Sequence, residues 1–245
     1  MPATRLPLLA FPGIPAGEQT MKLTAALIEA RTPTRVLPDR LAPLVPEGVL
    51  RRGADAVLAE RRDSGLWVFA YGALIWDDYY DCDERRLGTL HGMARRYCLR
   101  DTGNRGTPGR PSLTLGLEPA DGACAGVVVH LAKHGLERNL WAVWEHEMSG
   151  GLYDARWVQV ATAEGVVDAL TFVADPLNPM FAGKVPEEEG AAILASTAGP
   201  GGPAADYLRR TADGMRDWGA PDPYLDRLAA AVAVRLTPPR LSLAQ

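Results

Sequence analysis

The order of element types along the chain predicts an α+β fold. Six short strand-like runs fill most of residues 66–174, and one helical segment interrupts them. Helical spacing then dominates the last third of the 245 residues. Strands in a block followed by helices are typical of an α+β domain, whereas a doubly wound sheet alternates the two element types.

We expect two parts, an N-terminal extension over 1–62 and a larger domain over 63–240. Residues 1 to about 50 are rich in Pro and lack sustained apolar periodicity, which favours an irregular chain. Over 47–62, apolar residues recur with charged residues between them, and Gly65 follows. A short amphipathic helix is therefore expected near 47–62. Prolines interrupt the apolar stretch at the start of the chain, so we expect neither a signal peptide nor a membrane span.

The strands of the larger domain are predicted by short apolar runs separated by Gly, Pro, Asp and Asn turn signals. They are expected at 66–71, 87–100, 112–118, 123–131, 155–163 and 166–174.

The helices are predicted by apolar residues at spacings of three and four. One is embedded in the strand block, at about 135–148. The others follow in the C-terminal part, each with Pro near its start, over 186–198, 201–219 and 222–236.

Charge and composition favour a small metabolite, charged or neutral, as the ligand. The net charge of -4 gives no electrostatic reason to expect nucleic acid or an anionic membrane as a partner. Cys82, Cys98 and Cys124 lie far apart without a CxxC pair, so neither a disulfide framework nor a zinc site is predicted. We therefore expect no bound metal and a reducing, cytoplasmic compartment.

Glu147 is the most informative residue of the embedded helix. On a wheel of about 100° per residue, Leu136, Leu140, Val143 and Trp144 share the stripe that should be buried against the sheet. Glu147 falls about 20° from the first of these on that wheel, so it points inward. The pKa of a buried, unpaired carboxyl group rises, which suits a general acid or base near pH 7.

Helix geometry leaves a second interpretation of Glu147 open. A carboxylate at a frayed helix end can bend back to solvent or pair with an Arg. Gly150 and Gly151 follow directly and predict the end of the helix. A helix that stops just after an inward carboxylate places that group at the rim of a cavity, where a substrate has access.

Five segments of the chain carry a family resemblance. In chain order they read "WVFAYGALIW", "NRGTPGRPSLTLGL", "WEHEMSGGLY", "FVADPLNPMFAGKVP" and "STAGPGGPAADYL". They resemble the ChaC-like γ-glutamylcyclotransferases, in which the first three read "WVFGYGSLIW", "HRGTPxxPGxxLxL" and "REMxxGxY". The resemblance covers about residues 66–235 in the family's order.

The resemblance implies a small mixed β-barrel of the γ-glutamylcyclotransferase-like type, with flanking helices and a helical C-terminal part. It implies no metal, no organic cofactor, and cleavage of glutathione to 5-oxoproline and Cys-Gly. By position, the family's catalytic glutamate falls on Glu147, and its substrate-binding loop falls on Tyr71, Gly72, Ala73 and Leu74. A glycine turn leaves backbone N–H groups uncovered, and these can hold a substrate carboxylate or the γ-carbonyl oxygen. From composition alone, the same turn is a strand end beside core aromatics.

Glutathione carries two carboxylates, so guanidinium groups are expected around the site. Arg105 is the first candidate for contact with a substrate carboxylate. Further candidates are Arg95, Arg96 and Arg110, and for each of these three the alternative is a solvated surface position. Tyr153 either hydrogen bonds to the substrate or to the catalytic glutamate, or it only packs.

Four positions depart from the family's pattern. Ala73 replaces the usual Ser, Ala70 the usual Gly, Asn104 the usual His and His146 the usual Arg. These departures leave open a cyclotransferase that acts on another γ-glutamyl amide. The other alternative is a catalytically silent γ-glutamyl-binding module, although a pure binder of an anion gains nothing from a buried negative charge.

Overall fold

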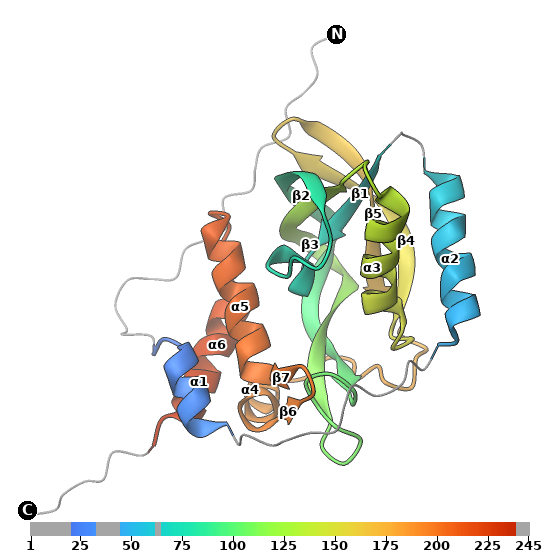
Figure 1. Cartoon of the computed structure of the whole chain (residues 1–245). Coiled ribbons are helices and arrows are strands. Elements are labelled where there is room, and N and C mark those ends of the chain that lie inside the picture. The colour runs from blue at the N-terminus through green and yellow to red at the C-terminus, as the bar shows by residue number, and fades with distance from the viewer. Residues whose placement is uncertain (1–20, 33–44, 62–64, 239–245) are drawn as a thin grey trace, which may run out of the picture.

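The centre of the molecule is a closed mixed β-barrel. The computed structural model describes residues 21–32, 45–61 and 65–238, and within these residues five strands form the barrel in the order β1-β3-β2-β4-β5 (Figure 1). β5 pairs in parallel with β1 and β3, and the remaining neighbours pair antiparallel. The predicted α+β class and mixed barrel are thereby confirmed. The strands are β1 (Leu66–Ala70), β2 (Cys82–Asp101), β3 (Ser112–Leu131), β4 (Tyr153–Thr162) and β5 (Gly165–Ala174).

β3 unites two runs that the sequence predicts as separate strands. It forms one long antiparallel ribbon with β2, in which His91 pairs with Ala123 and Met93 pairs with Pro119. One residue of β2 therefore faces three of β3 at this point. The Asp and Gly in that stretch mark a bulge inside the ribbon, so the prediction of a chain turn there was wrong.

The helices formed by the described residues lie on two sides of the barrel (Figure 1). α2 and α3 contact each other on one side, and α1, α4, α5 and α6 form a cluster on the other. A 3-10 turn, η1, follows β1, and a short hairpin of β6 and β7 precedes α5. The bounds are α1 (Ala25–Arg31), α2 (Glu47–Glu60), η1 (Ala73–Ile75), α3 (Leu136–Met148), α4 (Glu187–Ser196), β6 (Ala198–Gly199), β7 (Gly202–Pro203), α5 (Ala204–Asp217) and α6 (Pro223–Leu236).

α1 was not predicted from the sequence. It packs against α5 and α6, and Leu23 and Ile28 join the hydrophobic core. This part of the extension is therefore ordered by long-range packing instead of by its own periodicity. α2 lies where a helix is expected near 47–62. The boundary predicted at residue 62 and the stretches 1–20 and 33–44 lie outside the described residues, so the division into two parts stays a prediction.

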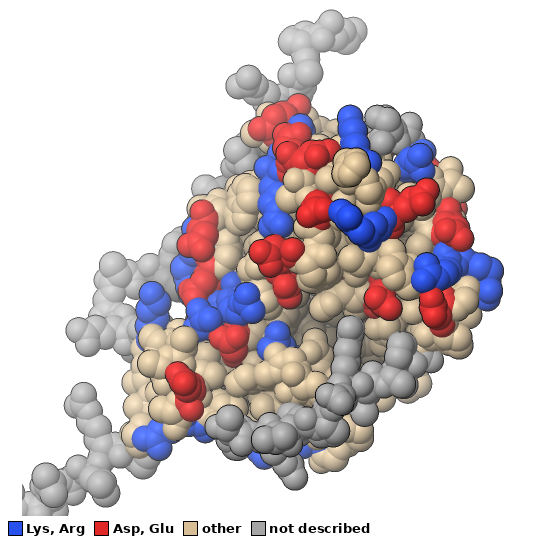
Figure 2. Space-filling view, viewed as in Figure 1, with Lys and Arg blue, Asp and Glu red and all other residues tan. Residues whose placement is uncertain are grey.

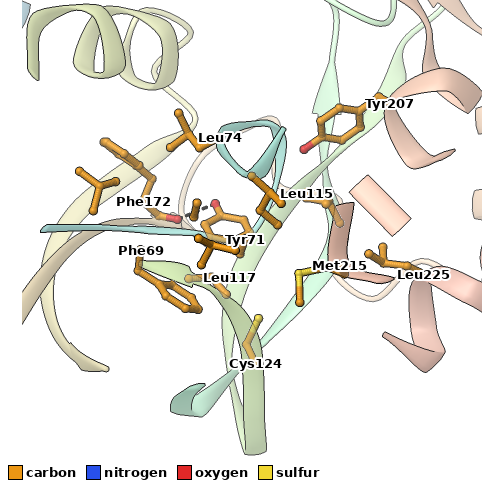
Figure 3. Packing of buried hydrophobic residues seen from close by; sticks show 14 of the residues in the cluster. Phe69, Tyr71, Leu74, Leu115, Leu117, Cys124, Phe172, Tyr207, Met215 and Leu225 are labelled. Atoms are coloured by element: carbon orange, nitrogen blue, oxygen red, sulfur yellow. Dashed lines mark hydrogen bonds between the residues drawn. The ribbon is translucent and has the colours of Figure 1, made fainter. Parts of the chain in front are cut away.

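One continuous core joins the barrel to the C-terminal helices. Figure 3 shows a part of it, with Phe69, Leu117 and Phe172 from the barrel and Met215 and Leu225 from α5 and α6. Burial of these side chains fixes α5 against the end of β1, where the predicted binding loop begins. Of the helices in 21–32, 45–61 and 65–238, none has the length and apolar character that a membrane crossing requires.

Candidate active site

The turn after β1, residues 71–74, presents backbone N–H groups that have no acceptor. The first N–H groups of any helix lack partners inside that helix. Among the described residues, the N–H groups of Gly72, Ala73 and Leu74 donate to no acceptor. This turn is the predicted substrate-binding loop, so its free donors lie where a substrate oxygen is expected.

The carbonyl groups of the same turn are all engaged. The middle two accept the N–H groups that close η1. The carbonyl of Tyr71 accepts a hydrogen bond from Nη1 of Arg95 at 2.8 Å, and that of Leu74 accepts one from the Tyr80 hydroxyl at 2.6 Å. The turn is therefore held by its acceptors and offers only donors, an arrangement that favours a ligand oxygen carrying negative charge.

Two of the predicted binding residues use their hydroxyl protons within the protein. Tyr71 is buried and donates to the carbonyl of Phe172 at 2.6 Å (Figure 3). Tyr153 donates to the carbonyl of Leu115 at 2.8 Å. Desolvation raises the pKa of both phenols well above the ordinary value, so both stay protonated and anchor the backbone around the turn.

Gly72 brings the turn directly against α5. A Cβ atom at this position would lie 2.7 Å from the hydroxyl oxygen of Tyr207, closer than real Cβ atoms come to a neighbour. In Figure 3 that hydroxyl points from its helix toward the turn. The glycine is thus required by a close approach between two elements, in addition to leaving N–H groups uncovered.

Glu147 stands on the last turn of α3, near the turn after β1. Desolvation raises its pKa from 4.5 to about 7, although the side chain is only half-buried and keeps access to solvent. Among the described residues it has no hydrogen-bond or ion-pair partner, so the predicted alternative of a pair with an Arg does not occur there. Leu140, Val143 and Trp144 are buried as expected, whereas Leu136 is half-buried.

The charge of Glu147 raises the pKa of four tyrosines that lie around it. Its negative charge opposes the ionisation of each phenol and so adds to the rise of each pKa, after the larger effect of desolvation. These phenols come from the turn after β1, the start of β4, the segment before β2, and α5. They are Tyr71, Tyr153, Tyr80 and Tyr207.

Arg105 lies beside the same cluster and is held from two sides. Its backbone N–H donates to the buried carboxylate of Asp101 at 2.6 Å, and its guanidinium group donates to the carbonyl of Gly201. The guanidinium carbon lies 5.6 Å from the centre of the Tyr207 ring. Desolvation lowers the pKa of Arg105, and its Nε has no hydrogen-bond partner among the described residues. It is a partly desolvated cation that an anionic ligand would stabilise.

The three further arginine candidates, Arg95, Arg96 and Arg110, lie in different environments. Arg95 is fully buried, and its Nε lies 2.9 Å from the carboxylate of Asp222, so the solvated position given as its alternative was wrong. The guanidinium carbon of Arg96 lies 4.9 Å from the centre of the Tyr224 ring. Arg110 is exposed. Arg95 therefore holds the turn after β1 through its hydrogen bond to the carbonyl of Tyr71, whereas Arg110 is exposed to solvent.

Two of the positions that depart from the family's pattern pack against neighbours. The Asn104 carbonyl accepts a hydrogen bond from the N–H group of Gly201 at 2.8 Å, which ties its loop to the β6–β7 hairpin. His146 stacks on the ring of Tyr79 at 4.7 Å. Both residues thus border the site through contacts with other elements.

Sequence reasoning missed Tyr207 and Tyr80. Tyr207 lies in the segment "STAGPGGPAADYL", but an aromatic residue on the apolar face of an amphipathic helix has the pattern of an ordinary core residue. The resemblance of that segment to the family was the one signal that pointed to it. Its proximity to the turn after β1 depends on packing between distant parts of the chain.

Other surface features lie apart from this site. Basic and acidic side chains are interspersed over the face drawn in Figure 2, without a large patch of one sign. Within 21–32, 45–61 and 65–238, no group of His, Cys, Asp and Glu side chains is arranged to hold a metal ion. A pocket of about 410 Å³ contains none of the predicted residues and is lined by Glu60, Trp157, Val158, Gln159 and Asp168.

Comparison with known proteins identifies the family. The family model described as "ChaC-like protein" matches residues 66–235. A glutathione-specific γ-glutamylcyclotransferase of Escherichia coli is 35% identical over 179 residues, which cover 72% of this chain and 77% of the relative. The glutathione-specific γ-glutamylcyclotransferase 1 of Mus musculus is 34% identical and covers 70% and 79%.

The fold agrees with these relatives. A crystal structure of a γ-glutamyl cyclotransferase specific to glutathione from yeast aligns with a TM-score of 0.62 and 21% identity. The alignment covers 71% of this chain and 100% of the yeast chain. At this identity the likeness concerns the fold, and the sequence match carries the assignment. The chain belongs to the ChaC-like protein family.

Proposed function

We propose that this protein is a γ-glutamylcyclotransferase that cleaves glutathione to 5-oxoproline and Cys-Gly. The main support for this proposal is the position of Glu147, a half-buried carboxyl group with a pKa of about 7, near a turn that offers only hydrogen-bond donors. The relatives named above carry this activity in their names. The lack of a single-signed surface patch on the face shown in Figure 2 favours a small molecule over nucleic acid as the partner. The free cysteines Cys82, Cys98 and Cys124 are compatible with the reducing, cytoplasmic location that we propose.

The reaction needs no nucleophile from the protein. In a γ-glutamyl amide the amine and the γ-carbonyl carbon belong to one molecule, so the site must fold the substrate and manage protons. Glu147 takes a proton from the substrate ammonium group, and the amine attacks the γ-carbonyl carbon to close a five-membered lactam. The bond from that carbon to the cysteinyl nitrogen then breaks as Glu147 returns the proton to the departing nitrogen. The ring nitrogen gives up its extra proton and the released amine gains one, by way of Glu147 or water, so that the products are a lactam N–H and an ammonium group.

The turn after β1 stabilises the intermediate of this reaction. Negative charge develops on the γ-carbonyl oxygen when the amine adds to the carbon. The N–H groups of Gly72, Ala73 and Leu74 are available to receive that charge, and one such donor contributes about 3 kcal/mol in comparable sites. Tyr71 and Tyr153 hold the turn and the adjoining strand in place through their bonds to backbone carbonyls.

Incubation with glutathione tests the proposed function. The expected result is release of 5-oxoproline and Cys-Gly in equal amounts, measured by chromatography with mass detection. Turnover of γ-Glu-Ala or a γ-glutamyl amine but not of glutathione would favour the cyclotransferase of other specificity, which Ala73 and Asn104 leave open. Binding of glutathione without turnover of any of these compounds would favour the silent binding module.

Replacement of Arg105 by Met tests the binding of a substrate carboxylate. Because the guanidinium group is partly desolvated, loss of a charge-assisted hydrogen bond is expected to raise KM for glutathione by about 10-fold to 100-fold, with a smaller change in kcat. Arg110→Met is the matched control, since that side chain is exposed, and its KM should stay within about twofold. An unchanged KM for Arg105→Met would remove Arg105 from the binding site.

A further inference from the structure

The hydroxyl groups of the tyrosines around Glu147 are not equivalent. Three of these tyrosines donate their hydroxyl proton to a backbone carbonyl at 2.6 to 2.8 Å, namely Tyr71, Tyr80 and Tyr153. Among the described residues, the hydroxyl of Tyr207 donates to no carbonyl group, and the side chain of Thr114 lies near it, as it also lies near the hydroxyl of Tyr153. A threonine hydroxyl can itself donate, so it leaves the Tyr207 proton available to a ligand.

The position of the Tyr207 hydroxyl is fixed by packing. Its ring makes edge contacts with the rings of Trp76 and Tyr97, both with centroids at 6.1 Å, and the residue is only 7% exposed. The hydroxyl oxygen lies 2.7 Å from the position that a Cβ atom at Gly72 would occupy, so it is close to the turn that carries the free N–H groups. Figure 3 shows the hydroxyl extending from α5 toward that turn. Fixed donors of this kind cost no reorganisation when charge develops.

The electrostatic surroundings keep Tyr207 protonated. Desolvation and the charge of Glu147 raise its pKa well above the ordinary value, and Arg105 only partly opposes this. At neutral pH the group is therefore a neutral donor and cannot act as a base. The guanidinium group of Arg105 over its ring adds positive potential on the same side of the site.

We propose that the Tyr207 hydroxyl donates a hydrogen bond to the γ-carbonyl oxygen of the substrate, next to the N–H groups of the turn after β1. This inference rests on the proposed function and adds a residue from α5 to its machinery. The bond strengthens as the carbonyl oxygen becomes an oxyanion, because a charged acceptor roughly doubles the strength of a hydrogen bond. No proton moves from Tyr207. It stabilises the tetrahedral intermediate, while Glu147 carries the proton.

The test compares Tyr207→Phe with Tyr97→Phe. Both changes remove one hydroxyl and keep the ring, and the Tyr97 hydroxyl is buried with no hydrogen-bond partner among the described residues. With glutathione as substrate, Tyr207→Phe is expected to lower kcat by about 10²-fold to 10³-fold and to change KM by less than about threefold. Tyr97→Phe should keep both constants within about twofold. Thermal unfolding midpoints of the two variants should agree within a few degrees.

Each other outcome has a definite meaning. A kcat of Tyr207→Phe within about threefold of wild type, or a loss confined to KM, overturns the inference and leaves the proposed function standing. An unfolded Tyr207→Phe beside a folded Tyr97→Phe assigns the hydroxyl a structural role and also overturns it. A wild-type protein that turns over neither glutathione nor another γ-glutamyl compound refutes the proposed function first, and the inference with it.

A second measurement checks the geometry without any activity. Gly72→Ala is expected to destabilise the wild-type protein, because the new Cβ would meet the Tyr207 hydroxyl oxygen at 2.7 Å. In the Tyr207→Phe background the nearest ring atom is 3.9 Å away, so the same change should cost clearly less. Equal losses of stability in both backgrounds would place the hydroxyl away from the turn and overturn the inference.

Discussion

Replacing Glu147 with Gln should lower kcat for release of 5-oxoproline by about 10³-fold or more while the protein stays folded. General acid and base catalysis contributes about 10² to 10⁴ in rate, and in the proposed reaction one group serves both steps. Gln keeps the shape of the side chain but acts neither as an acid nor as a base at neutral pH. Single-turnover measurements with glutathione at pH 7.5 check the prediction. A Gln variant of near-normal rate would refute the role of Glu147.

The same variant should be more stable than wild type at neutral and alkaline pH. The pKa of Glu147 is about 7 in the folded protein and near 4.5 in the unfolded chain, so the native state binds more protons between these values. The contribution of this group to stability is therefore complete below about pH 4.5 and is lost as pH rises through about 7. The pKa difference corresponds to about 3 kcal/mol at most.

Urea unfolding at pH 4.5 and pH 8 measures this effect. Glu147→Gln is expected to gain up to about 3 kcal/mol over wild type at pH 8 and close to nothing at pH 4.5. Glu145→Gln, two positions earlier on α3, is the matched control and should change neither stability nor kcat appreciably. A Gln variant that is less stable than wild type at pH 8 would show that the carboxylate has a stabilising partner.

The pH dependence of the reaction follows from the same group. Glu147 must be ionised to accept the ammonium proton. The value of kcat/KM should therefore rise with pH through about 7 and level off above it, once Glu147 is fully ionised. Glu145→Gln should keep this profile. A flat profile between pH 6 and pH 8 would mean that Glu147 is not the base.

Removal of the Asp222 carboxylate is expected to have the largest effect on stability. The side chain of Arg95 is 1% exposed and that of Asp222 18%, and the two charged groups lie 2.9 Å apart. Asp222→Ala leaves a buried guanidinium group without its counter-charge, which costs about 3 to 5 kcal/mol. Turnover should fall as well, because Arg95 also donates to the carbonyl of Tyr71 and so positions the turn after β1.

Two further variants separate the contributions to this effect. The Asp222 side chain also accepts from the N–H group of Tyr224 at the start of α6, so Asp222→Asn should keep most of this helix cap, worth about 1 kcal/mol, and lose the charge. Asp154→Asn breaks a half-exposed pair with Arg156 and should cost less than about 1 kcal/mol. Urea midpoints rank the three variants. A loss below about 1 kcal/mol for Asp222→Ala would contradict the buried-pair interpretation.

Local patterns in the sequence were sufficient for the fold class and for the inward direction of Glu147. Alternating apolar runs located the strands, because one face of each strand must be buried. The wheel of α3 placed Glu147 on the inward side, because helix geometry fixes direction from spacing alone. The family resemblance, and not the local pattern, pointed to the Tyr-Gly-Ala-Leu turn as the binding loop, and its free N–H groups follow from the start of a 3-10 helix.

The opposite side of the site depends on contacts between distant segments. Arg95 and Tyr207 show local patterns of a surface cation and of a core aromatic, and the spacing of their neighbours in the chain does not indicate otherwise. Arg95 becomes a buried support because Asp222 neutralises it across the fold. Tyr207 reaches Gly72 because the shared core presses α5 against the end of β1. Spacing along a helix or strand determines the direction in which a side chain points. The partner that the side chain contacts depends on which apolar surfaces of distant elements are buried against each other.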